Sequence, residues 1–450
     1  MDPSRSGPNE DAVLAEATNG NSTCKQPAAT DPAAPTSRGG WIPSGGLVST
    51  VFNFCALCIG AGVFSLPSAS CNAGIIMTIF YLLLISSLTV YSLYCLGLLM
   101  ERTGLKTYEE MAGALLGRGF HNFNGVLRAV NTFGGCVVFI KFIMGIVETT
   151  IKVSGTSGFW STTGGSRLIT FLMWLFIMLP LVIPRKIDSL RYVSTIGVSF
   201  IFYFLVVIVV HSFRHGLQQN IQNISPTYKD SNSIVLFNSG NAAVQEIGSF
   251  MFAFLCQTNS FELYYSMAQP SANRFTLHAS IAMAICVVIY MATGIFGYLD
   301  FGNSVKGSVL ENYNPIDESE IMVGFLGVFI KLCVSFALLL MASRNATYSV
   351  INWDPDTVPF WKHAGVVIAI ATSALLLGLF GPNLKTVILL LGSFCGGVSG
   401  FFFPALFVMY SGNWKLSTVG WFHFIMTYLV LMTGVVGISF GVVSTIYAAL

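Results

Sequence analysis

The sequence has few charged residues: Asp, Glu, Lys and Arg together make up only 9% of its 450 residues. A typical soluble domain carries about 25%, so this chain lacks the side chains that would cover a water-exposed surface. Hydrophobic residues make up 54% of it, and 37 residues are Phe. The composition excludes a soluble globular protein. Because a backbone in lipid must satisfy its own hydrogen bonds, the long apolar runs predict an all-α integral membrane protein.

Several motifs are also missing. The pattern GxxxxGK[ST] does not occur, and the six His residues form no arrangement of nucleophile, base and acid. The net charge is only +2, and basic residues form no cluster. We therefore expect no ATP-driven transport, no enzyme activity, no nucleic-acid partner, no cofactor and no metal. The ten Cys lie mostly in apolar runs, which predicts small buried hydrophobic residues rather than disulfides.

Residues 1–44 lack large apolar groups and are rich in Pro, Ala, Ser, Thr, Asn and Gly. Such a segment cannot bury enough surface to offset its chain entropy, so we expect a disordered cytoplasmic tail. It has no apolar stretch of the kind found in a cleavable signal peptide. Residues 45–450 are expected to form a single transmembrane transporter domain.

About eleven apolar segments are long enough to span a bilayer, which takes roughly 20 residues. If the N-terminus is inside, Lys and Arg in the inner segments outnumber those outside by thirteen to six. This asymmetry predicts a cytoplasmic N-terminus. The expected spans are 46–70, 74–99, 122–152, 167–184, 190–212, 240–266, 276–300, 321–350, 361–380, 384–410 and 418–448.

Two local motifs lie between spans. Of three N-glycosylation triplets, only that of Asn223 falls in an outer loop, where it is a candidate acceptor or a chance match. Residues 103–121 have the pattern of a short amphipathic helix on the inner face. Thr107 and Glu110 in this segment have the spacing of a capping box.

The first span is interrupted by Gly60, Ala61 and Gly62, followed by Val63. The half-helix that begins near Gly62 would point its N-terminus at the bilayer centre, where its amides and positive dipole end favour an anion. A substrate carboxylate is the expected occupant. The alternative is close helix packing through small residues.

The sixth span contains five consecutive small or polar residues and then an acid. The acid, Glu262, is a candidate partner for a cationic substrate side chain or for a coupling proton, because carboxylates are costly within a membrane. Asn259 and Glu262 also have capping-box spacing, so a helix cap is the alternative. The expected pocket wall is Cys256, Gln257, Thr258, Asn259, Ser260 and Glu262.

The third span carries Lys141, Glu148 and Lys152 at helical spacing. Glu148 is expected to pair with one of the lysines. If Lys141 faced Glu262 instead, the pocket would lose its negative charge and favour neutral substrates. Two breaks at membrane depth, in the first and sixth spans, are typical of secondary transporters that bind substrate near the midplane and work by alternating access.

Three stretches resemble the amino acid/auxin permease family. They are Asn53 through Gly74, Phe254 through Gly302, and Gly381 through Pro404. The order of the motifs is consistent over roughly residues 45 to 445. The polar tail and the composition resemble the trypanosomatid branch most.

The resemblance implies a five-plus-five inverted repeat like that of the bacterial leucine transporter (the APC superfamily), with an appended eleventh span. In sodium-coupled relatives an Asn of span one and a hydroxyl of span eight bind the ion. Asn53 matches the first, but residues 336–341 contain no hydroxyl, although Ser335 and Ser343 flank them. The resemblance therefore favours proton coupling or facilitated exchange over sodium coupling. Gln257 and Glu262 replace His and Pro of many relatives.

These observations lead to one main hypothesis and two alternatives. The main hypothesis is a secondary active or facilitative amino acid transporter that favours arginine and lysine. It would lie in the plasma membrane rather than in an organelle. The alternatives are a neutral amino acid permease of the same family and a transporter-like amino acid receptor.

Overall fold

The computed structural model describes residues 45–155, 157–184, 188–225, 234–238, 240–351, 353, 357–412 and 414–449. The expected cytoplasmic tail, residues 1–44, lies outside the described residues. Within them the protein is almost entirely helical, as the composition predicts.

Seven of the expected spans form helices without a non-helical break, and their ends lie within a few residues of the predicted ones. A helix satisfies every backbone group except those at its ends, which suits an apolar chain in lipid. These helices are α4 (Ile75–Thr103), α6 (Arg118–Val153), α9 (Asp188–Arg214), α14 (Ala272–Phe301), α15 (Ser319–Ile351), α16 (Phe360–Phe380) and the compound helix α17 (Leu384–Leu390), η7 (Leu391–Phe402) and α18 (Phe403–Tyr410).

Two further spans are also compound helices, in which a π-helical turn interrupts the α-helix. The fourth is α7 (Thr163–Met173), η3 (Trp174–Met178) and α8 (Leu179–Val182). The last is α20 (Trp421–Val436), η8 (Gly437–Gly441) and α21 (Val442–Ala449).

The first and sixth spans are broken, as predicted. The first consists of α2 (Leu47–Cys58), η1 (Ala61–Ser65) and α3 (Leu66–Ala73), with a bend of 49°. The sixth consists of α11 (Asn241–Gln245), α12 (Ile247–Ala253), η4 (Gln257–Asn259) and α13 (Ser260–Tyr265).

Among the described residues, nine helices are long and apolar enough to cross a membrane, and the bent pair makes a tenth. The prediction of about eleven spans exceeds this by one. The difference is the sixth span, whose pieces are each too short to cross alone. The five-plus-five repeat stays a prediction.

Short helices and two short strands lie between the spans. α5 (Tyr108–Leu116) begins with the predicted capping box: Thr107 Oγ1 accepts from the Glu110 amide at 3.1 Å, and Glu110 Oε2 accepts from the Thr107 amide at 3.2 Å. The other connecting elements are η2 (Phe159–Ser161), α10 (Leu217–Ile221), β1 (Ile224–Ser225), β2 (Ile234–Val235), η5 (Gly302–Ser304), η6 (Val309–Glu311) and α19 (Leu416–Val419). β1 and β2 pair in parallel, with Ile224 opposite Ile234.

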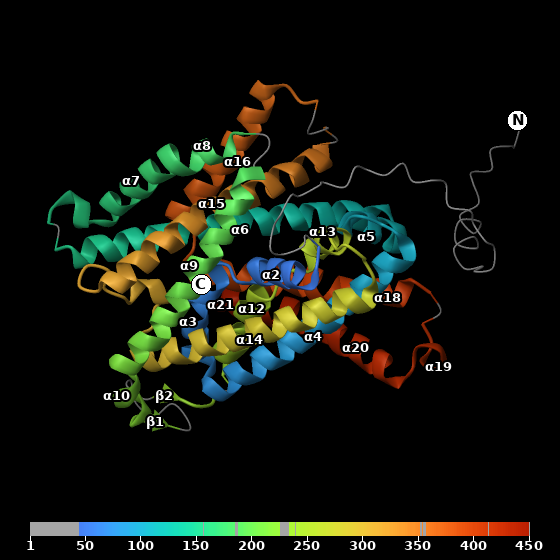
Figure 1. Ribbon diagram of the computed structural model, residues 1–450, viewed down its shortest axis with the longest axis horizontal. Coiled ribbons are helices and arrows are strands. Elements are labelled where there is room, and N and C mark those ends of the chain that lie inside the picture. Colours follow the sequence, from blue (N-terminus) through green and yellow to red (C-terminus); the bar gives the residue numbers. More distant parts are fainter. Residues whose placement is uncertain are drawn as a thin grey trace, which may run out of the picture. The chain divides into compact units, whose positions relative to one another are not determined.

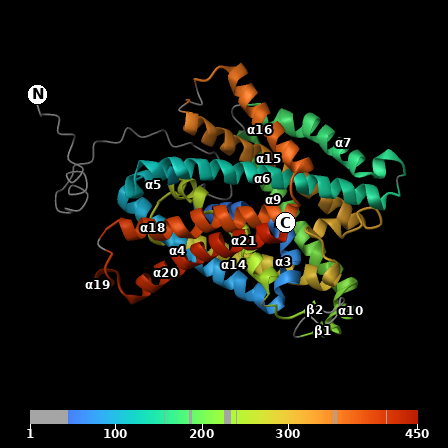
Figure 2. The same ribbon diagram turned by 180° about the vertical axis from the view of Figure 1, so that it is seen from behind.

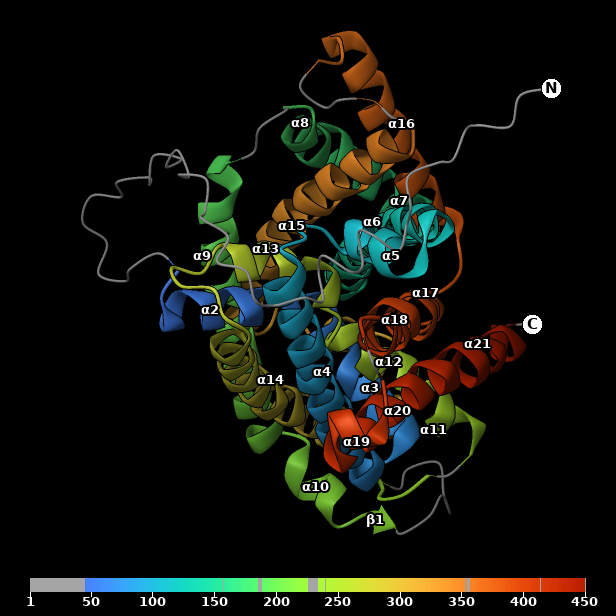
Figure 3. The same cartoon turned by 90° about the vertical axis from the view of Figure 1, so that its right-hand side faces the viewer.

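The helices pack so that the broken spans lie inside. α4 and α14 run side by side along one flank (Figure 1). α6 packs along α15, and α15 also packs against α9 (Figure 2). α20 lies beside α18 and η7 at the periphery (Figure 3). One hydrophobic core includes residues from both broken spans, such as Phe54, Phe64 and Phe254.

α12 and η7 approach each other through glycines. A Cβ added to Gly392 would lie 1.8 Å from the Gly248 carbonyl oxygen, and one added to Gly248 would lie 2.6 Å from the Leu389 carbonyl oxygen. Small residues let two membrane helices come into backbone contact. The contact holds the sixth span against the tenth.

We expect Gly392→Ala to destabilise the protein, because the new methyl group meets a backbone atom that cannot rotate away. Overpacking of this kind costs about 1–3 kcal/mol, measurable as a lower midpoint of thermal unfolding in detergent. Gly365→Ala in α16 is the matched control, since an added Cβ meets nothing within 4 Å there. Equal midpoints for the two variants would contradict the close packing.

Candidate substrate site at the two helix breaks

The first break leaves backbone groups outside any helix. α2 ends at Cys58, and the Gly60 amide donates to the Cys58 carbonyl at 2.8 Å. A Cβ added to Gly60 would meet nothing within 4 Å, whereas one added to Gly62 would lie 3.2 Å from the Phe252 ring. Gly60 therefore borders open space, and Gly62 packs against α12.

The second break is also largely buried. Gln257 and Ser260 are inaccessible to solvent, whereas Thr258 and Asn259 are partly exposed. Gln257 Oε1 accepts from the Cys256 amide at 3.0 Å, which satisfies one backbone group of the unwound segment. Gln257 Nε2 is buried with no hydrogen-bond partner among the described residues, and it lies close to Gly400 in η7.

A single hydroxyl joins the two breaks. The Tyr290 hydroxyl in α14 donates to the Cys58 carbonyl at 2.6 Å and also lies 2.9 Å from the Ala253 carbonyl. These two carbonyls belong to the last residues of α2 and α12, where a helix has no internal donor for its final C=O groups. Tyr290 is fully buried. It therefore satisfies the ends of both half-helices.

Cysteines surround this junction. The Cys58 side chain contacts those of Cys256 and Cys286, and Cys55 contacts Cys286. All nine described cysteines are free thiols, and all but Cys71 are buried. The prediction of buried cysteines is confirmed for eight of these nine, Cys71 being only partly buried; Cys24 lies outside the described residues.

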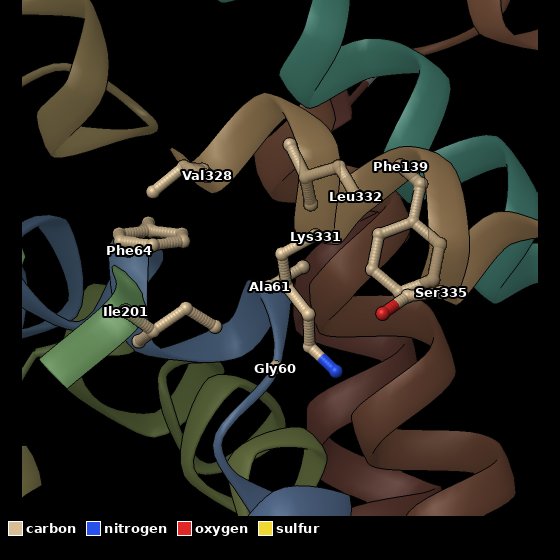
Figure 4. Close-up of a pocket in the computed structure, with 9 residues that line it drawn as sticks. All are labelled: Gly60, Ala61, Phe64, Phe139, Ile201, Val328, Lys331, Leu332 and Ser335. Carbon is tan, nitrogen blue, oxygen red and sulfur yellow. The ribbon is translucent and has the colours of Figure 1, made fainter. Parts of the chain in front are cut away.

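A small cavity opens against the first break, between α9, α15 and α6. Most of its wall is apolar, and its two polar side chains, Lys331 and Ser335, both come from α15 (Figure 4). The enclosed space is about 10 Å³, which is the room that one water molecule needs. The lining residues are Gly60, Ala61, Phe64, Phe139, Ile201, Val328, Lys331, Leu332 and Ser335.

Lys331 is the charged residue of this wall. Its side chain is 5% exposed, and it extends from α15 past Ala61 toward Gly60 (Figure 4). The sequence analysis missed it, although a lysine within the apolar run 321–350 is itself a signal, because charges at membrane depth are costly and usually functional.

Glu262 lies elsewhere. Its side chain is 74% exposed and pairs at 3.5 Å with Arg128, which also pairs with Glu109 at 3.2 Å. α13 has no capping hydrogen bond from Asn259. Neither the pocket position nor the cap predicted for Glu262 is found; it belongs to an ion-pair cluster with α5 and α6.

The other predicted polar residues are also separated from the cavity. Asn53 is exposed on α2. Lys141 does not face Glu262; its ammonium donates to the Gly378 and Gly381 carbonyls at 3.1 and 3.3 Å. Glu148 pairs with Lys152 at 3.7 Å, so the expected pairing is confirmed. Of the predicted site residues, only Gly60 and Ala61 line the cavity. Asn223 is exposed in the turn before β1, and its glycosylation stays a prediction.

The fully buried carboxylate of the sixth span is Glu246, which the sequence analysis also passed over. Its Oε1 lies 2.7 Å from both Lys385 Nζ and Asn72 Nδ2, and Oε2 accepts from Ser249 at 2.8 Å. Asn72 belongs to α3, so Glu246 ties the first broken span to the sixth and, through Lys385, to α17. Glu246 lies within the predicted span 240–266, and an acid at membrane depth is a signal of an important residue.

Broken first and sixth spans, joined at their ends and bordered by a cavity, are the arrangement of a membrane transporter. The family described as "Transmembrane amino acid transporter protein" matches residues 43–447. The chain belongs to this family. It is therefore a multi-pass membrane transporter rather than an enzyme. Human sodium-coupled neutral amino acid transporter 7 is 27% identical over 381 residues, which cover 80% of this chain and 78% of that protein.

We expect Tyr290→Phe to weaken both the fold and transport. Removing the hydroxyl takes this donor from both carbonyls; the Cys58 carbonyl keeps the Gly60 amide, whereas the Ala253 carbonyl loses the partner described for it. An unsatisfied buried group costs about 1–3 kcal/mol. The midpoint of thermal unfolding should fall, and amino acid uptake should fall with it because the breaks are no longer held together. Tyr410→Phe is the control, since Tyr410 is exposed. Unchanged stability and uptake in Tyr290→Phe would show that the breaks do not depend on this hydroxyl.

Proposed function

We propose that this transporter carries neutral amino acids by alternating access, with the substrate carboxylate held between Lys331 and the backbone at Gly60 and Ala61. The observation that carries the proposal is the charge of the cavity wall: its nine lining residues include one cation, Lys331, and no carboxylate.

The carboxylate position follows from two features. η1 and α3 together form one helix from Ala61 to Ala73, whose N-terminal amides and positive dipole end favour an anion. Lys331 adds a full positive charge on the same cavity. Gly60 leaves room beside these groups, because no atom lies within 4 Å of where its Cβ would be.

The positive charge of the cavity wall disfavours a cationic substrate. A lysine or arginine side chain about 5 Å from Lys331 would meet a repulsion of about 3 kcal/mol at an effective dielectric constant of 20. Glu262, the expected counter-charge, is paired with Arg128 outside the cavity. The geometry therefore supports the neutral alternative over arginine and lysine. The human relative is named for neutral amino acids, which agrees with this proposal.

The cavity is too small for an amino acid in this conformation. About 10 Å³ holds one water molecule and cannot hold an amino acid. Its walls must move apart to admit a substrate, and α9, α15 and the first break supply those walls. Counterflow of labelled leucine in proteoliposomes separates transport from reception, since a receptor binds leucine without accumulating it.

The orientation and the membrane are part of the proposal. The excess of Lys and Arg in inner segments supports a cytoplasmic N-terminus. We place the protein in the plasma membrane. A tag at either terminus, probed in intact and permeabilised cells, tests both statements.

Lys331→Met should raise the KM for leucine and glutamine by more than tenfold, because losing a buried charged partner costs about 2–5 kcal/mol. Inhibition by arginine should become relatively stronger, since the repulsive charge is gone. Competition with labelled leucine in proteoliposomes measures both effects. Lys106→Met is the control, as Lys106 is exposed in the loop before α5. Arginine competing as well as leucine in the unmodified protein would sink the proposal.

Replacing sodium with choline should change uptake less than twofold. A sodium ion near the cavity would be repelled by Lys331, and the expected ligand Asn53 is exposed away from it. An inward proton gradient should instead stimulate uptake. A steep sodium dependence would show that Ser335 and backbone carbonyls complete an ion site despite the lysine.

A further inference from the structure

Two histidines and a glutamate meet where α9 ends, at the end of the molecule that also carries α10 (Figure 1). His211 and His215 are four residues apart, so they project from the same face of the helix. Glu318 directly precedes α15. One ligand atom from each of the three residues lies within 4.8 Å of the other two. None of the three takes part in the proposed substrate site.

Hydrogen bonds orient both imidazoles. His211 Nδ1 lies 2.6 Å from Asp300 Oδ2, and His215 Nδ1 lies 3.2 Å from the His211 carbonyl oxygen. A carboxylate and a carbonyl can only accept, so Nδ1 of each ring carries a proton and Nε2 is the atom left for a metal ion. His211 Nε2 faces the Glu318 carboxylate and donates to it here, so an ion binds there by displacing that proton. Histidines that bind metals almost always donate their other N–H to such an acceptor. His211 Nε2 lies 3.2 Å from Glu318 Oε1.

The residues around the two histidines are held in place by hydrogen bonds and an ion pair. The Asp300 side chain is 1% exposed and accepts from the Tyr313 hydroxyl at 3.3 Å. Burial and the nearby Asp300 carboxylate raise the pKa of Tyr313 well above its usual value, so its hydroxyl remains a donor. The Asn220 side-chain amide donates to the Asp300 carbonyl at 3.2 Å. The nearby cation Arg214 pairs with Glu320 at 3.6 Å.

We propose that His211, His215 and Glu318 bind a divalent transition-metal ion, with zinc as the preferred ion and Asp300 as a positioning residue. Two imidazoles and one carboxylate are a known zinc donor set that leaves a fourth position for water. Imidazole nitrogen favours zinc over magnesium or calcium, which take oxygen ligands. His215 is exposed, so an ion reaches the site from solution. The expectation of no metal overlooked a pair of histidines at the end of a span and a partner more than 100 residues away.

An ion here would join two walls of the cavity. α9 contributes Ile201 to that wall, and α15 contributes Lys331 with its neighbours. Glu318 lies at the start of α15, and His211 and His215 lie at the end of α9. A bound ion would therefore restrain the movement of α9 against α15 that opening requires. This consequence, unlike the site itself, rests on the proposed transport function.

Binding is tested on the full-length protein, purified in detergent with its affinity tag removed. Titration with zinc chloride in a calorimeter should give about one ion per chain, and cobalt should give the absorption bands of a tetrahedral site. His215→Ala and Glu318→Gln should each weaken zinc binding more than tenfold. His121→Ala is the matched control, because His121 lies near the start of α6 and outside the cluster. Zinc binding of equal strength in the unmodified protein and in both site variants would overturn the proposal.

Asp300→Asn distinguishes positioning from ligation. The asparagine cannot hold His211 Nδ1–H as a carboxylate does, so zinc affinity should fall by about 10–100-fold, while the cobalt bands keep their positions because the ligands are unchanged. Unchanged affinity would remove Asp300 from the site.

The consequence for transport is measured separately, in proteoliposomes. Zinc added on the side that carries α10 should inhibit leucine uptake, and His215→Ala should relieve that inhibition while its basal uptake stays unchanged. Zinc that binds in the calorimeter without slowing uptake would overturn the restraint on α9 and α15 but not the metal site.

Discussion

The structure depends on how it satisfies backbone groups at two helix ends inside a membrane. α2 and α12 both stop at membrane depth, where their last carbonyls have no internal donor and no surrounding water. The hydroxyl of Tyr290 reaches one carbonyl from each, at Cys58 and Ala253. This lets both spans remain broken without leaving polar groups open to lipid. The cavity exists because the first break can persist, since its wall includes the unwound backbone at Gly60.

A second buried contact joins the same two spans toward their other ends. Glu246 accepts from Asn72 of α3 and pairs with Lys385 of α17. A buried carboxylate with a nearby cation and two further hydrogen bonds has its acceptor positions occupied, so it ties segments together instead of offering a vacant charge to a ligand. Lys331 instead lies in the cavity wall. With Glu246 away from the cavity and Lys331 in its wall, the candidate site has a positive wall. This charge is the physical reason for preferring a substrate whose only full negative charge is its α-carboxylate.

The sequence was sufficient to predict the helical spans and the positions of both breaks. Hydropathy reports on lipid contact, and Gly60 to Gly62 and Cys256 to Ser260 interrupt it visibly. It was insufficient for the partners of those breaks. Glu262 looked important because it is an acid beside a break, yet it turns outward to Arg128. Tyr290 looks like any aromatic residue of an apolar helix, and only the packing of α14 against α2 brings its hydroxyl to the break. Lys331 was visible as a charge in an apolar run, but its distance in sequence from Gly60 concealed that the two share a cavity.

The closed cavity limits which elements can move. α4 and α14 are long helices packed side by side, and bending them would break internal hydrogen bonds. The broken spans already depart from the helical hydrogen-bond pattern at Gly60, Leu255 and Cys256, so these points can change backbone angles at lower cost. α9 and α15 are long helices without a non-helical break, so a shift between them would move each helix as a whole. An opening that admits an amino acid is therefore expected to combine a hinge at the breaks with a rigid shift of α9 against α15. The Tyr290 hydroxyl, shared between two carbonyls, can stay with one of them while the other moves. The same interaction that closes the helix ends thus permits the conformational change that transport requires.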